Sequence, residues 1–418
     1  MTAPARRVLM LQYYFPPLVG MGSVRAVKLA AQLPDFGWTP TVVASRSGPD
    51  GSDPSLAPAD GEILRTRQLR LRRPGAAAPR PAATAPAAST AGGVRALLHR
   101  WIYRPDAQIG WYPFALRAAR RTLRERPADV VFSSSFPITA HLVARTLHRE
   151  TGLPWIAEFR DTWSDGSVQH GRRLAADTAL ERALVREATG VVTVSDTWAE
   201  LFRARGARRV WTLTNGFDPN DFAAEAPPPD LGVTYVGTYY PHKQDLLTPI
   251  AALGTLVREP RFAALTLRFV GELHPALPPA LATHGLSGHV ECTGFVPHAA
   301  CVRHAMTSRV LLVAGPPTDE RPELRGNIAG KIFECLATRR PILFVGAPDS
   351  DAARLLRPFP RVRIVRPGDV AGATAALRAA LTEPSPTGGD LAPFTHRALA
   401  GRLAQILSAA HADSRKAV

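Results

Sequence analysis

The chain has little cysteine and no long apolar stretch. Only three cysteines occur among its 418 residues, and their spacing is not that of metal ligands. This excludes a disulfide scaffold, offers no structural zinc site and is typical of a reducing compartment. No apolar run approaches the roughly 20 residues of a membrane-spanning helix, and residues 8–11 are too short for a secretory signal core. We therefore expect a cytoplasmic protein, with peripheral contact to the inner face of the membrane left open.

Lysine is scarce although the chain is basic. Lys and Arg together number 51 against 35 Asp and Glu, a net charge of +16. Such a charge fits nucleic acid, an anionic membrane face or anionic small substrates as partners. Only four of the cations are lysines: Lys28, Lys243, Lys331 and Lys416. Because lysine and arginine are not equivalent at tight anion sites, these few lysines are candidates for such sites.

Short apolar runs alternate with amphipathic helical patterns along the chain. This alternation predicts parallel sheets covered by helices on both faces. The expected strands are residues 8–11, 41–44, 130–133, 155–159, 191–194, 210–213, 233–236, 265–270, 290–293, 310–313, 342–345 and 362–365. The expected helices include residues 24–33, 114–126, 175–188, 330–338 and 398–410.

These strands are too many for one doubly wound sheet, and prolines 227–229 separate two series of them. We expect an α/β protein with two Rossmann-like domains facing a cleft, residues 1–226 and 227–392. A terminal segment, 393–418, is expected to pack back toward the first domain. The low-complexity residues 72–93 indicate a flexible insertion. Residues 94–126 mix aromatics with arginines, which fits either an inward-packed helical hairpin or a face for a bulky acceptor or membrane.

The loop after the first strand is rich in glycine, with Gly20 and Gly22 before a helix. Glycines there let backbone N–H groups approach an anion, and a tight turn is the alternative interpretation. Arg25 stands where a dinucleotide fingerprint has its third glycine, and the second strand ends Ala-Ser-Arg without a carboxylate for a ribose. A nicotinamide-dependent dehydrogenase is therefore disfavoured.

Two loops of the second half carry lysines. Gly237 and Thr238 follow a strand, and Lys243 comes just before a helix expected from about Gln244, an arrangement that suits an anion. Lys331 and Glu334 lie three residues apart and so share one helix face. A surface ion pair is the simple interpretation, but the neighbouring apolar residues predict a largely buried helix, where charges are costly without a task.

No metal or cofactor is expected. The Asp-Ser-Asp at 349–351 follows a strand and precedes a helix, so we interpret it as a helix cap rather than a metal motif. The histidines show no ligand spacing. His298 is interpreted as a loop or cap residue, and His242 as a neighbour of a phosphate.

Together these motifs resemble a known family, the retaining GT-B glycosyltransferases of family four, over nearly the whole chain. The resemblance is carried by Tyr-Tyr-Phe-Pro-Pro at 13–17, Phe-Arg-Asp-Thr-Trp at 159–163, Val-Ser at 194–195, Thr-Asn-Gly-Phe-Asp at 214–218, Val-Gly-Thr at 236–238 with the lysine at 243, Gly-Lys-Ile-Phe-Glu at 330–334 and Arg-Pro-Ile-Leu at 340–343.

The resemblance implies that the second domain binds a nucleoside-diphosphate sugar and the first domain an acceptor. Glu334 matches the carboxylate that binds the ribose hydroxyls, and Lys243 matches the lysine that neutralises the diphosphate. Gly20 matches the glycine that meets the phosphates, and Val296 a backbone position beside the base. The remaining candidates are Gly22, Gly237, Thr238, Asn327, Ile328, Ala329 and Gly330 for the donor, and Tyr14, Arg25 and Trp163 for the acceptor.

The chain departs from the family pattern at three positions. Gly326 stands where the family has its first glutamate, so Glu320, Glu323 or the backbone N–H groups of residues 327–330 are alternatives. Thr238 replaces a family arginine, and we expect Lys331 to supply that cation. Where many relatives have a histidine, Arg160 and Asp161 are the catalytic candidates.

The expected function is sugar transfer from a nucleotide sugar to a hydroxyl or amine of a sugar, lipid-linked or small-molecule acceptor, with retention. A nucleotide-sugar epimerase of the same fold and a non-catalytic nucleotide-sugar-binding protein are the alternatives. Nucleic-acid binding rests on net charge alone and is not expected. The acceptor, the donor's sugar and base, and the oligomeric state stay open.

Overall fold

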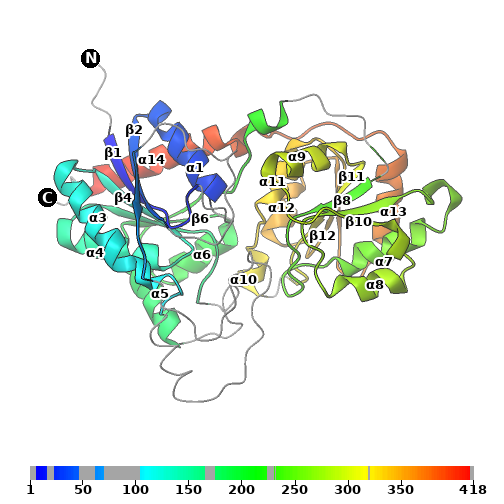
Figure 1. The fold of residues 1–418 in the computed structure, drawn as a ribbon, viewed down its shortest axis with the longest axis horizontal. Helices are drawn as coiled ribbons and strands as arrows, with labels where there is room; N and C mark the ends of the chain where they lie inside the picture. The colour runs from blue at the N-terminus through cyan, green and yellow to red at the C-terminus, as the bar shows by residue number, and fades with distance from the viewer. Residues whose placement is uncertain are drawn as a thin grey trace. The chain divides into compact units, whose positions relative to one another are not determined.

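The computed structural model describes residues 6–16, 23–46, 62–69, 104–164, 175–223, 230, 232–318 and 321–414. The chain divides into two compact units, which we call unit 1 (Met1–Thr214 with His396–Val418) and unit 2 (Asn215–Thr395). Unit 1 contains a sheet of seven strands and unit 2 a sheet of six. Within each unit, helices cover both faces of the sheet (Figure 1). The expected pair of parallel-sheet folds is confirmed.

The sheet of unit 1 has the order β3-β2-β1-β4-β5-β6-β7, and all its neighbouring strands pair parallel. Apart from Glu158, apolar and small residues fill its central strands β4 and β5, which are buried on both faces, as is typical of parallel strands. The strands are β1 (Arg6–Leu11), β2 (Trp38–Ser45), β3 (Glu62–Thr66), β4 (Val130–Ser135), β5 (Trp155–Phe159), β6 (Gly190–Thr193) and β7 (Val210–Thr212).

Two helical layers cover this sheet. One layer comprises α3 (Tyr112–Glu125), α4 (Thr139–Thr151), α5 (Ala175–Glu187) and α6 (Asp196–Ala204), and the other comprises α1 (Ser23–Gln32) and α14 (His396–Ser414). The C-terminal helix α14 buries Leu399, Leu403 and Leu407 in the same cluster as Trp38. The indole of Trp38 also donates to the Ser408 hydroxyl at 3.2 Å. Helix α14 is thus part of the core of unit 1.

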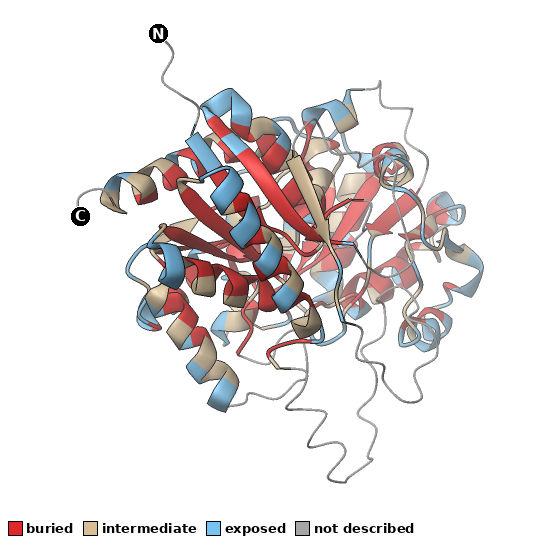
Figure 2. Ribbon diagram, turned by 60° about the vertical axis from the view of Figure 1, so that its left-hand side comes forward, coloured by how far each residue is buried: buried red, intermediate tan, exposed pale blue. Residues whose placement is uncertain are grey.

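Unit 2 repeats the architecture with the order β10-β9-β8-β11-β12-β13, again all parallel. Its strands are β8 (Gly232–Val236), β9 (Thr266–Val270), β10 (Val290–Cys292), β11 (Val310–Ala314), β12 (Ile342–Val345) and β13 (Val362–Val365). Its helices are α7 (Leu247–Leu256), α8 (Leu277–Thr283), α9 (His298–Thr307), α10 (Pro322–Arg325), α11 (Lys331–Ala337), α12 (Asp351–Leu356) and α13 (Val370–Thr382). Figure 2 shows the central strands buried and the outer faces of the helices exposed.

The strand order reverses once in each sheet, between β1 and β4 and between β8 and β11. In open parallel sheets, ligands bind beyond the carboxyl ends of the strands at such a reversal. The loops that follow these four strands are therefore where a site is expected in each unit. Among the described helices, none combines the length and the apolar character needed to cross a membrane.

The structure differs from the sequence-based expectation in three places. Strand β3 is additional, and the helix after Lys243 begins at Leu247 rather than near Gln244. It begins later because Asp245 accepts hydrogen bonds from the backbone N–H groups of Leu247 and Thr248. The compact units divide at residues 214 and 215, since Phe217 packs in the core of unit 2. The expected boundary at 226–227 and the insertion 72–93 lie outside the described residues.

Of residues 94–126, those from 104 onward are described. Trp111 is fully buried in the core of unit 1, which agrees with inward packing of the aromatics. Arg120 and Arg121 pair with glutamates at the surface.

The packing of α14 predicts a large stability loss in Leu403→Ala. The side chain is fully buried, and removing such a leucine costs about 2–5 kcal/mol. Urea unfolding of the full chain should show the loss, whereas Gln405→Ala, on the exposed side of the same helix, should leave the midpoint unchanged. Equal midpoints for both variants would contradict the assignment of α14 to the core.

Candidate functional site

The loop that follows β8 is held in one conformation by Tyr235. The Tyr235 hydroxyl lies 2.9 Å from the Thr238 carbonyl and 3.0 Å from Oε1 of Gln244. That same Oε1 accepts from the backbone N–H of Tyr240 at 2.9 Å. Gly237 has φ +91°, and its N–H donates to the Val270 carbonyl at 2.8 Å. Only glycine adopts this conformation without strain, which explains glycine at the end of the strand.

Lys243 ends this loop in a turn that its own N–H closes onto the Tyr240 carbonyl at 2.9 Å. The residue is partly exposed. Among the described residues, its ammonium makes no hydrogen bond or ion pair. Lys243 therefore presents a cation next to the strand reversal of unit 2.

Lys331 is the first residue of α11, and its ammonium is buried. The Nζ atom lies 3.7 Å from the centroid of the Tyr235 ring and has no hydrogen-bond partner in the described structure. Burial lowers the pKa of Lys331 to about 7, an effect that the neighbouring Cys335 opposes. Helix α11 packs on one face of the sheet and Tyr235 on the other. The side chain therefore reaches over the end of β8 instead of pairing with Glu334.

The residues that lead into α11 include backbone donors without acceptors. The Asn327 N–H donates to the Leu324 carbonyl at 3.0 Å. The N–H groups of Ile328, Ala329 and Gly330 have no acceptor among the described residues. Three consecutive amides beside a buried ammonium form a surface suited to an anion.

Glu334 lies one turn into α11 and is bound by a histidine from another helix. Nε2 of His298, the first residue of α9, lies 2.9 Å from Oε1 of Glu334. The side chain of His298 is 19% exposed and that of Glu334 is 31% exposed, so a ligand can still reach this hydrogen-bonded pair. Val296 lies two residues before His298 in the loop that leads into α9, and the neighbouring Phe295 is 70% exposed.

The pairing of His298 was missed by sequence reasoning, which interpreted this residue as a loop or cap residue. The two partners are 36 positions apart, and no local pattern links them. The one available signal was that both follow strands, β10 and β11, whose carboxyl ends share one edge of the sheet.

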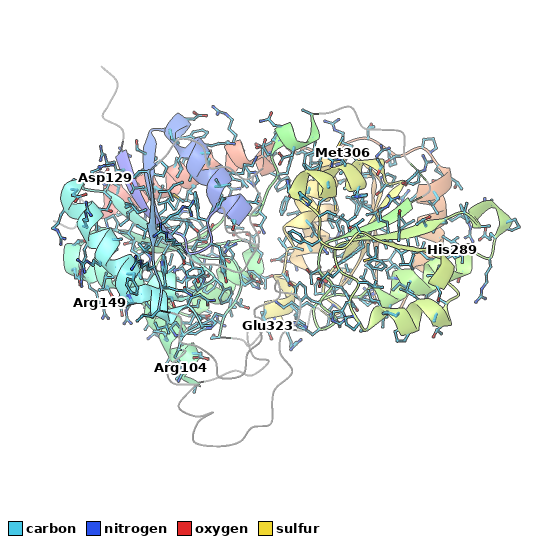
Figure 3. The ribbon with its side chains drawn as sticks, viewed as in Figure 1. Arg104, Asp129, Arg149, His289, Met306 and Glu323 are labelled. Atoms are coloured by element: carbon cyan, nitrogen blue, oxygen red, sulfur yellow. The ribbon has the colours of Figure 1, made fainter. Side chains whose placement is uncertain are left out.

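Gly326, in the place of the family's first glutamate, is buried at the end of α10. Figure 3 labels Glu323 on that helix. Its carboxylate lies 3.9 Å from the Arg321 guanidinium, and Glu320 lies outside the described residues. Glu323 thus faces Arg321, a residue of its own segment.

In unit 1, Arg160 follows β5 and is held by the end of β4. Its Nε donates to the Ser135 carbonyl at 2.7 Å and to the Ser134 hydroxyl at 3.1 Å. Ser134 in turn donates to Oε2 of Glu158 at 2.6 Å. Burial lowers the pKa of Arg160, while Glu158 and Asp161 act to raise it. The two catalytic candidates Arg160 and Asp161 thus lie in one electrostatic cluster.

Arg25, expected to contact an acceptor, is 5% exposed and bound inside unit 1. It donates to Oε1 of Glu158 at 3.1 and 2.9 Å and to the Leu213 carbonyl at 3.0 Å, and it also binds the Thr214 carbonyl. Burial acts to raise the pKa of Glu158, but Arg25 and Arg160 outweigh it and the pKa is lowered. Arg25 therefore links the end of β5 to residues 213 and 214, where the first segment of unit 1 ends.

Trp163 and Tyr14, the other acceptor candidates, differ in their surroundings. Trp163 is 5% exposed in the core of unit 1, and its N–H donates to the buried Glu181 at 3.2 Å. Tyr14 is partly exposed. Burial raises its pKa to about 12, with Tyr13 and Asp106 adding to the shift and Arg160 opposing it. Of the three, Tyr14 is the side chain open to a ligand; Gly20 and Gly22 lie outside the described residues.

Within the described residues, no three His, Cys, Asp or Glu side chains lie together in a way that could hold a metal ion. The segment 349–351 begins α12, where the Ser350 hydroxyl caps the helix by accepting from the Ala353 N–H at 3.2 Å. The capping interpretation is confirmed, and Ser350 is the residue that caps.

Comparison with known proteins finds a family model that matches the first part of this chain. Residues 22–216 match the model of the family described as "Glycosyl transferase 4-like domain". No curated protein sequence matches the chain.

Solved structures with the same fold cover nearly the whole chain. Sucrose-phosphate synthase from Thermosynechococcus elongatus has a TM-score of 0.59 at 13% identity, over 98% of this chain and 98% of that chain. The apo form of the lipopolysaccharide outer core galactosyltransferase WaaB has a TM-score of 0.59 at 12% identity, over 96% and 99%. UDP-GlcNAc 2-epimerase from Methanocaldococcus jannaschii has a TM-score of 0.51 at 8% identity, over 96% and 99%. These likenesses show the GT-B fold, which transferases and epimerases share.

The buried ammonium predicts that Lys331→Met stabilises the protein. The pKa of Lys331 is about 7 in the folded chain and 10.5 when unfolded. As the pH falls from 10.5 to 7, the unfolded state binds a proton that the folded state does not, so wild-type stability declines and then levels off. Lys331→Met has no group there to take up a proton, so its stability does not show this decline. Its gain in the free energy of unfolding, measured with urea, should be larger at pH 7 than at pH 10, by on the order of 3 kcal/mol. A gain that does not vary with pH would contradict a buried, unpartnered ammonium.

Proposed function

We propose that this chain, a retaining glycosyltransferase of the GT4 type with the GT-B fold, binds its nucleoside-diphosphate sugar at the strand reversal of unit 2. The observation that carries the proposal is the group of donors without acceptors around β8 and β11: Lys243, Lys331 and the amides of residues 328–330. A diphosphate supplies the acceptors that these groups lack.

The diphosphate leaves the sugar carrying new negative charge, so stabilising that charge is the main catalytic demand. Lys243 approaches it from the loop after β8, and the amides of Ile328, Ala329 and Gly330 approach it from the loop before α11. Lys331 takes the place of the arginine that Thr238 replaces. The ammonium is held within reach of the same end of β8, over Tyr235.

Binding by Lys331 requires a proton. With a pKa of about 7, a large share of the free protein has Lys331 neutral at physiological pH. An entering diphosphate favours the ammonium form, and ligand binding is then coupled to proton uptake. The cost of the buried, unpartnered ammonium in the free protein is removed when the anion arrives.

Glu334 accepts hydrogen bonds from the ribose, and the backbone at Val296 lies beside the base. This places the nucleoside across the carboxyl ends of β10 and β11. Thr238 lines the diphosphate through its backbone N–H, and Gly237, whose N–H stays bound to the Val270 carbonyl, gives the chain the turn that this requires.

The acceptor is bound by unit 1, with Tyr14 as the open side chain. Arg160 and Asp161 orient the reacting groups, while Arg25 and Glu158 hold Arg160 in place through Ser134. Trp163 supports the same loop from the core. In a front-face reaction, the departing phosphate oxygen takes the acceptor's proton, so that no separate general base is needed. The acceptor class, whether sugar, lipid-linked or small molecule, is left open by these residues.

Replacing Lys243 with alanine should weaken donor binding. The loss of a charge-assisted hydrogen bond is worth about 1.5–3 kcal/mol, which corresponds to roughly 10- to 150-fold in the dissociation constant. Calorimetry with the best ligand from a panel of nucleoside diphosphates measures it. Arg258→Ala, which removes an exposed cation of the same unit, should change the constant less than twofold. If both variants bind as the wild type does, Lys243 is not a donor ligand.

Donor affinity should fall with rising pH above the pKa of Lys331. Above pH 8, the dissociation constant of a nucleotide sugar should rise about tenfold per pH unit, because the protonated fraction of Lys331 falls by that factor. Below pH 7 it should level off, since the folded pKa is about 7. Lys331→Met should bind more weakly at pH 7 and lose this dependence. A slope that persists in the variant would assign it to another group.

A further inference from the structure

The contact between His298 and Glu334 determines what the carboxylate can still bind. An ionised carboxylate only accepts hydrogen bonds, so the imidazole Nε2 is the donor at the 2.9 Å contact with Oε1. The donor reaches Oε1 from α9, a different helix, and the pair is at most 31% exposed. Glu334 therefore enters any complex with one oxygen already engaged and Oε2 available.

A ribose presents two neighbouring hydroxyls to such a carboxylate. When both oxygens are open, each hydroxyl donates to its own oxygen, and the loss of one hydroxyl leaves an acceptor unsatisfied. Unsatisfied acceptors are what make a site discriminate strongly against a ligand that lacks a donor. With His298 on Oε1, that oxygen already has a donor and keeps one lone pair, so the loss of the second ribose hydroxyl no longer leaves it unsatisfied. The carboxylate is then satisfied by one hydroxyl together with the imidazole.

We propose that His298 is a specificity-determining residue that makes the nucleoside subsite tolerant of a missing ribose hydroxyl, so that 2′-deoxyribonucleoside-diphosphate sugars are accepted as donors alongside ribonucleoside ones. This inference rests on the proposed function, in which Glu334 binds the nucleoside. It concerns the sugar of the nucleoside and is independent of which base the site prefers.

Two features of unit 2 support this role for His298. Glu334 is fixed in the first full turn of α11 between buried residues Phe333 and Cys335, so its backbone has little freedom to turn away. His298 begins α9, whose Val302, Ala305 and Met306 are buried. Both partners thus project from packed helices, which fix the positions of their backbones.

The test compares UDP with 2′-deoxy-UDP, which have the same base and diphosphate and differ in one hydroxyl. Calorimetry gives the ratio of their dissociation constants for the wild type, His298→Ala and His298→Gln. The wild-type ratio should be below about threefold. In His298→Ala, Oε1 has only the second ribose hydroxyl as a donor. The dissociation constant of 2′-deoxy-UDP divided by that of UDP should therefore rise to about tenfold or more. In His298→Gln the amide again supplies an N–H, and the ratio should return toward the wild-type value.

His289→Ala is the matched control, since His289 precedes β10 in the same unit and binds the Leu265 carbonyl at 2.9 Å. Its ratio should equal that of the wild type. Thermal unfolding checks that each variant is folded, and His298→Gln keeps the test valid if the alanine variant is not.

The outcomes separate the two proposals. A wild-type ratio of tenfold or more, or a ratio that is the same in all His298 variants, overturns the role of His298 while leaving donor binding intact. If neither nucleotide binds the wild type, and no other pair of ribo- and deoxyribonucleoside diphosphates does, the proposed function itself fails.

Discussion

Parallel strand pairing is the constraint on which both units depend. Neighbouring parallel strands are joined by crossover helices, so helices cover both faces of each sheet. The loops therefore lie along the two sides of the sheet at which the strands begin and end. The residues with proposed roles follow the carboxyl ends of β1, β5, β8, β10 and β11. Side chains from loops far apart in the sequence therefore meet, as His298 and Glu334 do. The chemistry of the chain depends on this shared edge.

At that edge the protein keeps interactions that lower its stability. A buried ammonium over Tyr235, without an acceptor, is unfavourable in a folded chain. A buried pair such as Arg25 and Glu158 is also weak evidence for stability, because desolvation offsets much of its attraction. The buried ammonium and the buried ion pair are examples of preorganisation. Their groups are desolvated and oriented before a ligand arrives, so less reorganisation is needed when the ligand binds.

The sequence predicted every described strand except β3, and the pattern is clearest in central strands such as β4 and β11, which are buried throughout. It missed β3, an edge strand whose five residues are all half-buried and include Glu62 and Arg65. Composition and resemblance identified Lys243, Lys331 and Glu334 as candidates, but spacing alone could not show that Lys331 turns toward Tyr235 or that Glu334 meets His298. Arg25 was predicted to face a ligand, and only tertiary packing shows it bound to Glu158.

The C-terminal helix has a consequence for biosynthesis. The chain leaves unit 1 at Thr214, completes unit 2 and only then returns at His396. At about 5–20 residues per second, the ribosome needs on the order of ten to forty seconds for that excursion. During this time the nascent first unit exposes the apolar groove that Leu399, Leu403 and Leu407 will fill. Its maturation therefore waits until α14 has been synthesised, and chaperones have that interval in which to shield the groove.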